Sequence, residues 1–138
     1  MRCIVSQESA GVWAPQALLG VVVDALANRR FPLEDEKGLQ NAMLAVLAHR
    51  FPGAVKREVR IAAGDLIDFL VHVPGRAGGI GIEVKIKGER GAIARQVARY
   101  AASPLVDAVV LATLRPMVLP ATVAGKPAVV VDLGRAWL

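Results

Sequence analysis

The chain is poor in cysteine and in aromatic residues, and each shortage limits the sites it can build. Cys3 is the only cysteine among the 138 residues, and aromatic residues make up 4% of the sequence. One thiol cannot form an internal disulfide or provide a zinc site on its own, so we expect a reducing, cytoplasmic location. No series of aromatic residues and no recognition helix for reading bases is visible. The sequence therefore gives no indication of base specificity.

Long apolar runs are also missing. The longest one covers residues 17–27, includes Asp24 and is too short to span a bilayer. It has neither the basic start nor the cleavage site of a signal peptide, so we expect no leader and no membrane partner. A content of 54% apolar residues excludes a disordered chain. The length predicts one domain over residues 1–138, without internal repeats.

The positive charge is concentrated in one segment. The formal net charge of +5 favours a polyanionic partner, of which DNA is the one we expect. Between positions 85 and 99 the chain has one acidic residue, Glu89, and five basic residues: Lys85, Lys87, Arg90, Arg95 and Arg99. Such a segment can contact a phosphate backbone.

Hydrophobic periodicity and turn residues predict the order of helices and strands. Apolar residues recur at helical spacing over residues 16–28 and 34–50, and Pro52-Gly53 ends the second segment. Strands at residues 55–61, 66–73 and 80–86 are joined by connections typical of hairpins. A helix at residues 89–101 and strands at 108–113 and 128–133 follow. The sequence therefore predicts an α/β domain with a mixed central sheet flanked by helices.

Asp68, Glu83 and Lys85 are the most informative residues. Asp68 falls in the middle of an apolar strand, where a carboxylate is costly unless it is paired or binds a cation. Because side chains alternate along a strand, Glu83 and Lys85 project from the same face. Two carboxylates and a lysine on neighbouring strands can hold a divalent cation and activate a water beside it.

An acid on one strand followed by Glu-Val-Lys on the next resembles the catalytic signature of the PD-(D/E)xK nuclease superfamily. The resemblance covers about residues 33–115. It implies a restriction-endonuclease-like αβββαβ core, extended by an N-terminal helix and a C-terminal strand. It also implies Mg²⁺, or Mn²⁺ in its place, held by Asp68, Glu83 and the carbonyl of Val84. Lys85 would assist the attacking water, and the implied activity is hydrolysis of phosphodiester bonds in DNA.

The resemblance extends to two helices. Many superfamily members have a glutamate on the first helix, and Glu36 shares a helix face with Leu39 and Met43. The string RQVARYA resembles the Gln-x-x-x-Tyr motif of the branch that includes recombination-type and processive exonucleases. By this resemblance Gln96 and Tyr100 would lie close to the catalytic lysine and the DNA backbone. Contacts with phosphates are expected from three further residues: Lys87, Arg95 and Arg99.

The sequence leaves several alternatives open. Asp65 competes with Asp68, although its place in a turn suits a turn-stabilising role better. Simple charge at a helix start would explain Glu36 as well as Glu34. The apolar helix at residues 16–28 supports either a homo-oligomer or packing on the chain's own sheet.

The function also has alternatives. One is a DNA-binding module that keeps this fold and does not cut, and another is an assembly protein in which the motif is accidental. Endonuclease, exonuclease and junction resolvase are not separated either. The Gln-x-x-x-Tyr string favours end-processing or repair enzymes, whereas the small size favours a simple endonuclease.

Overall fold

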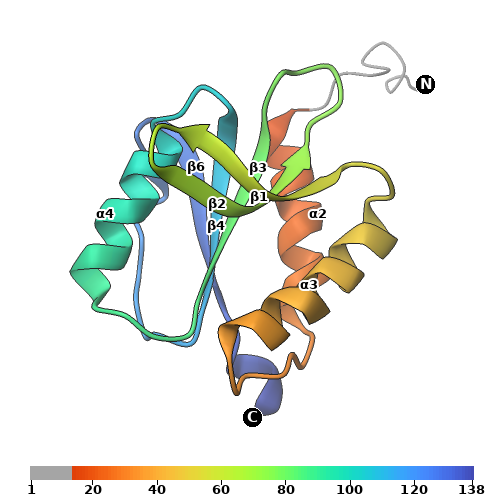
Figure 1. Ribbon diagram of the computed structural model, residues 1–138, viewed down its shortest axis with the longest axis vertical. Coiled ribbons are helices and arrows are strands. Elements are labelled where there is room, and N and C mark those ends of the chain that lie inside the picture. Colours follow the sequence, from red (N-terminus) through yellow and green to blue (C-terminus); the bar gives the residue numbers. More distant parts are fainter. Residues whose placement is uncertain (1–13) are drawn as a thin grey trace.

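A mixed six-stranded sheet with helices on both faces makes up residues 14–138, the part of the chain that the computed structural model describes (Figure 1). Cys3 lies outside these residues. The elements are, in chain order, α2 (Pro15–Ala27), α3 (Glu36–Arg50), β1 (Val55–Ala62), β2 (Asp65–His72), β3 (Gly79–Lys85), α4 (Arg90–Ala101), β4 (Val106–Thr113), β5 (Thr122–Val123), β6 (Lys126–Asp132) and a 3-10 helix, η1 (Arg135–Trp137). Within residues 14–138, no helix has the length and apolar character needed to traverse a bilayer.

The strand order β1-β2-β3-β4-β6-β5 divides the sheet into two halves. β1, β2 and β3 form an antiparallel meander, as their connections predict. β3, β4 and β6 are parallel neighbours, and α4 connects β3 to β4. The carboxyl ends of these three strands therefore lie at one edge of the sheet, where Lys85, Thr113 and Asp132 are in register. This is the edge at which open α/β sheets commonly bind ligands.

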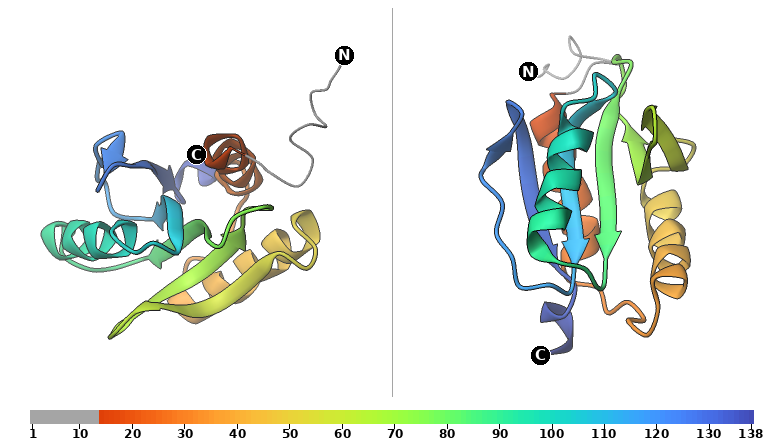
Figure 2. Two further views of the ribbon diagram at one scale, coloured as in Figure 1. Left: turned by 90° about the horizontal axis from the view of Figure 1, so that it is seen from above. Right: turned by 60° about the vertical axis from the view of Figure 1, so that its left-hand side comes forward.

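Each helix buries its apolar residues against the sheet. α2 and α3 lie on one face and α4 on the other (Figure 2). The buried residues of α3 are Leu39, Met43 and Leu47, which recur at helical spacing. α2 buries four apolar residues and contacts β3, β4 and β6. Its apolar face thus packs on the chain's own sheet, and a homo-oligomer stays a prediction.

The predicted helices and strands occur at the predicted places, with differences at their ends. α3 begins at Glu36 rather than at residue 34 because Asp35 is its N-cap, and the Asp35 carboxylate accepts the Gly38 N–H at 2.7 Å. The sequence predicts neither β5 nor η1. These elements have two and three residues, which is too short for hydrophobic periodicity to indicate them.

β1 and β2 depart from regular strand geometry at the level of Asp68. Glu58, on β1, has a φ of 54°, in the left-handed region that residues other than glycine rarely adopt. The strands keep one register on both sides of this level, with Arg57 opposite Phe69 and Val59 opposite Ile67, and the register shifts between Arg60 and Ala62. Phe69 belongs to the core beneath α2 and α3, whereas Ile67 packs beneath α4. Since residues two apart share a face in a regular strand, β2 changes face at Asp68.

Candidate active site

Four of the predicted site residues come together at the carboxyl end of β3. Asp68 lies in the middle of β2, Glu83 and Lys85 lie near the end of β3, and Glu36 is the first residue of α3. The Lys85 Nζ is 3.6 Å from the Glu83 Oε2, so the two side chains share a face as the alternation predicts. Segments far apart in the sequence therefore supply one cluster.

The two carboxylates occupy a gap between β2 and β3. The regular pairing of these strands ends at Phe69 and Ile82. Beyond this pair the main chain bonds to side chains instead. The Asp68 N–H donates to Glu83 Oε1 at 3.3 Å, and the Val84 N–H donates to Asp68 Oδ2 at 2.8 Å. These bonds fix both carboxylates in neighbouring positions.

Glu36 reaches the same region from the start of α3, in the helical layer that covers one face of the sheet. Its Oε1 accepts the N–H of Ile86 at 3.2 Å, across fifty residues of sequence. Glu36 is half-buried, whereas Glu34 and Asp35 are exposed, and Asp35 caps the helix. The three neighbouring acids therefore have different environments, and Glu36 is the one that contacts the end of β3.

The surroundings disfavour negative charge on both strand carboxylates. Burial raises the pKa of Asp68 above its ordinary range, and the charge of Glu36 acts in the same direction, against the bond from Val84. Burial, followed by the charge of Asp68, raises the pKa of Glu83 to about 8 despite the ammonium group of Lys85. A cation bound between the carboxylates would favour the ionised form of each.

The donor set fits a hard divalent cation. Asp68 and Glu83 supply carboxylate oxygens, which Mg²⁺ prefers over nitrogen or sulfur ligands. The N–H and C=O of one strand residue face the same side, so the Val84 carbonyl faces the side on which its N–H meets Asp68. In residues 14–138, no group of three His, Cys, Asp or Glu side chains is arranged to hold a metal.

Gln96 and Tyr100 are hydrogen-bonded to each other on α4, and Tyr100 is hydrogen-bonded to β2. The Gln96 Nε2 donates to the Tyr100 hydroxyl at 2.7 Å, and this hydroxyl donates to the Leu66 carbonyl at 3.0 Å. Tyr100 is 2% exposed, and burial raises its pKa, with the charges of Glu83 and Asp68 adding to the effect. The hydroxyl therefore stays protonated and able to donate. In this structure the pair supports the strand that carries Asp68.

The three residues expected to contact phosphates lie together beside Lys85. Lys85, Gln96 and these residues, Lys87, Arg95 and Arg99, line a surface pocket of about 350 Å³ with the first turn of α4. Glu89 caps α4 there through the N–H groups of Gly91 and Ala92. The pocket is predominantly cationic and adjoins the carboxylates.

Asp65, the competing acid, has a structural partner. Its Oδ1 accepts from Arg99 at 3.4 Å, which joins the start of β2 to α4. It makes no contact with Glu83, and the main-chain bonds that place Asp68 in the gap are specific to Asp68. The geometry therefore favours Asp68 as the acid of the cluster.

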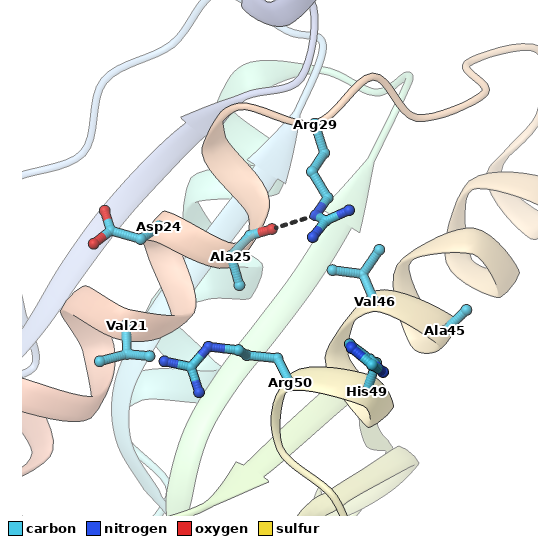
Figure 3. A pocket seen from close by; sticks show the side chains of 8 residues that line it. All are labelled: Val21, Asp24, Ala25, Arg29, Ala45, Val46, His49 and Arg50. Carbon is cyan, nitrogen blue, oxygen red and sulfur yellow. Dashed lines mark hydrogen bonds between the residues drawn. The ribbon is translucent and has the colours of Figure 1, made fainter.

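A second groove, between α2 and α3, has a different composition (Figure 3). Its volume is about 560 Å³, and Arg29, His49 and Arg50 line it together with Asp24. These basic residues lie at the C-terminal ends of the two helices, where cations complement the helix dipole. The Arg29 Nε also donates to the Ala25 carbonyl at 3.2 Å. None of the residues at the end of β3 lines this groove.

Sequence reasoning does not identify two features near the cluster. The first is the Leu66 carbonyl. Every residue has a main-chain carbonyl, so the residue type does not indicate this one. The second is Glu58, whose positive φ lies opposite Asp68. A glycine would have indicated such a position, but the sequence has a glutamate there.

Comparisons of the chain with family models, with curated proteins and with solved structures give no match.

Proposed function

We propose that this protein is a divalent-metal-dependent nuclease that hydrolyses phosphodiester bonds in DNA. The observation that carries the proposal is the carboxylate pair of Asp68 and Glu83, held in the gap between β2 and β3 with Lys85 beside it. The order α3, β1, β2, β3, α4, β4 supports the finer proposal of a restriction-endonuclease-like core, because it is the αβββαβ order that the PD-(D/E)xK resemblance implies.

The residues of the cluster would have different roles in such a reaction. Asp68, Glu83 and the Val84 carbonyl would hold Mg²⁺ or Mn²⁺, and the cation supplies charge neutralisation and a water of lowered pKa. The Lys85 side chain is a quarter exposed, so its ammonium group can face both the carboxylates and an incoming phosphate. It would orient the attacking water and offset the charge that develops on the phosphorus centre. Glu36 would fix the end of β3 through its bond to Ile86.

The cationic pocket beside Lys85 gives the DNA backbone a place to bind. Lys87 is exposed there. Arg95 pairs with Glu89 at 3.8 Å between two exposed side chains, and Arg99 contacts Asp65 through one carboxylate oxygen only. Contacts of this kind bind phosphates without reading bases, and they weaken as salt is added.

Cleavage assays on four DNA forms test the proposal. Supercoiled, linear double-stranded, single-stranded and branched DNA are each incubated with Mg²⁺, with Mn²⁺ and with EDTA. We expect products only with a divalent metal. Lys85→Ala should lose at least about 100-fold in rate, because it removes a charge-stabilising group. Lys56→Ala, at an exposed position on β1, is the matched control and should cut normally. The preferred DNA form separates endonuclease, exonuclease and resolvase.

Two outcomes would count against the nuclease. Full activity in a folded Lys85→Ala protein would contradict the role of Lys85. No products from the folded wild type on any DNA form, combined with salt-sensitive DNA retention in EDTA, would favour the non-cleaving DNA-binding module.

A further inference from the structure

Trp137 differs from every other aromatic residue that the structure describes. Phe31, Phe51, Phe69 and Tyr100 are at most 9% exposed, whereas Trp137 is 50% exposed. Exposing half of an indole to water forgoes a large apolar contribution to stability. The position of the ring therefore calls for an explanation other than packing.

Arg30 holds one side of the Trp137 ring. Its guanidinium lies 5.4 Å from the ring centroid, in cation–π geometry. The Arg30 Nε also donates to the carbonyl of Ala136, the residue before the tryptophan, at 2.8 Å. Two contacts from one side chain thus fix the orientation of an exposed ring. We call these two residues the Trp137–Arg30 platform.

The surroundings of the platform suit a flat heterocycle. A pocket of about 610 Å³ is lined by Arg30, Pro32, Leu33, Glu34 and Trp137. The indole and the guanidinium offer planar stacking surfaces, and Pro32 and Leu33 offer apolar contact. The Glu34 carboxylate can accept hydrogen bonds from amino groups. These are the groups with which proteins bind an unstacked nucleobase.

The platform lies beside the candidate active site. Glu34, in the pocket wall, precedes Glu36 of the cluster by two residues. η1 follows the carboxyl end of β6, and β6 is two strands from β3 in the same parallel half of the sheet. Two strand spacings amount to about 10 Å. Figure 1 shows the loop before α3, the end of β3 and η1 at the same end of the molecule.

We propose that the Trp137–Arg30 platform stacks an unpaired base of the DNA, so that the substrate has a single-stranded segment: an overhang, a flap or a single strand. The strand's phosphates would contact the cationic pocket on the α4 side of Lys85, and the base would stack on the other side of Glu36. The place of this contact in cleavage rests on the proposed nuclease function. The binding of the base does not.

Tryptophan fluorescence in EDTA tests the platform without cleavage. The chain has two tryptophans, so a Trp13→Phe background leaves Trp137 as the single reporter. A short oligothymidylate, a blunt duplex and thymidine monophosphate are titrated at one fixed salt concentration. Oligothymidylate should quench the fluorescence, and the blunt duplex should quench it weakly. Free thymidine monophosphate should bind much more weakly than the oligothymidylate, because it lacks the phosphates for the cationic pocket.

Affinity of the full chain for a labelled oligothymidylate provides the second measurement. Trp137→Ala should weaken binding by roughly 5- to 150-fold, the range for loss of one stacked base. Trp137→Phe should stay within about threefold of the wild type because it keeps an aromatic face. Val118→Ala, which shortens an apolar side chain that is 89% exposed outside this pocket, should have no effect. Circular dichroism confirms that each variant folds.

The outcomes separate this proposal from the nuclease. Unchanged oligothymidylate affinity in Trp137→Ala overturns the platform, even if cleavage depends on Lys85. A loss confined to single-stranded DNA, in a protein that never cuts, keeps the platform and removes the nuclease. Equal quenching by thymidine monophosphate and oligothymidylate would overturn the polymeric substrate, because it would indicate a site for free nucleotides.

Discussion

Replacing Glu83 with glutamine tests the electrostatics of the site directly. In the folded protein, burial and the charge of Asp68 raise the pKa of Glu83 from its ordinary 4.5 to about 8. Between these pH values the folded protein keeps a proton that the unfolded chain has released. The free energy of unfolding therefore falls as the pH rises from 4.5 to 8, and it changes no further above 8 through this group.

The magnitude follows from the same two pKa values. They differ by about 3.5 pH units, and each unit corresponds to about 1.36 kcal/mol, so the upper limit is about 5 kcal/mol. The amide cannot form the ion pair that ionised Glu83 makes with Lys85, whose Nζ lies 3.6 Å away and whose side chain is partly exposed. Such a pair contributes at most about 1 kcal/mol. We expect Glu83→Gln to raise the free energy of unfolding by about 2 to 4 kcal/mol at pH 8, and by less than about 1 kcal/mol at pH 4.5.

Urea unfolding in EDTA at pH 4.5, 6, 7 and 8 measures this difference. Glu34→Gln makes the same change at an exposed position and should alter the free energy of unfolding by less than about 0.5 kcal/mol. Adding Mg²⁺ at pH 8 should stabilise the wild type and not Glu83→Gln, because a ligand stabilises only the state that binds it. The reasoning is refuted if the advantage of Glu83→Gln does not grow between pH 4.5 and 8.

Two further substitutions test the scaffold of the site. Tyr100→Phe removes the hydrogen bond to the Leu66 carbonyl, and we expect the free energy of unfolding in urea to fall by about 1 to 2 kcal/mol. Mg²⁺ should also stabilise this variant less, because β2 then positions Asp68 less firmly. Unchanged Mg²⁺ stabilisation would show that the hydroxyl has no positioning role. Gly79→Ala would place a methyl group against the Val71 carbonyl and should unfold the protein or cost several kcal/mol, whereas Gly20→Ala, which meets no atom within 4 Å on α2, should gain about 0.5 to 1 kcal/mol. Equal stability of the two alanine variants would contradict the close approach of β2 and β3 at Gly79.

The shared face of Glu83 and Lys85 could be predicted from the sequence because it follows strand periodicity. Glu83 and Lys85 are two residues apart on one strand, so their shared face needed no structural information. Asp68 was recognisable as a charged residue in an apolar strand. The bonds that join them were not, because both donors are main-chain N–H groups, which every residue type except proline possesses.

Other features could not be predicted, for physical reasons that differ. Glu36 was selected by the resemblance and by the helix face it shares with Leu39 and Met43, but the sequence did not show that Asp35 caps α3, because neighbouring acids at a helix start have similar propensities. The change of face at Asp68 accompanies the left-handed backbone of Glu58. The alternation of apolar residues alone predicts a regular strand without such a change. The Trp137–Arg30 platform joins two segments more than 100 residues apart through a short helix, so no local pattern indicates it.

The backbone irregularity at Glu58 has a consequence for how the molecules behave in concentrated solution. β1 is the outermost strand on its side of the sheet, and an outermost strand can recruit a strand from another chain. Lys56, Glu58 and Arg60 are exposed along it, and the left-handed residue interrupts the row of extended backbone that a partner would need. The left-handed backbone at Glu58, which accompanies the change of face at Asp68, therefore also disfavours edge-to-edge aggregation. A variant with a straightened β1 should therefore be less soluble.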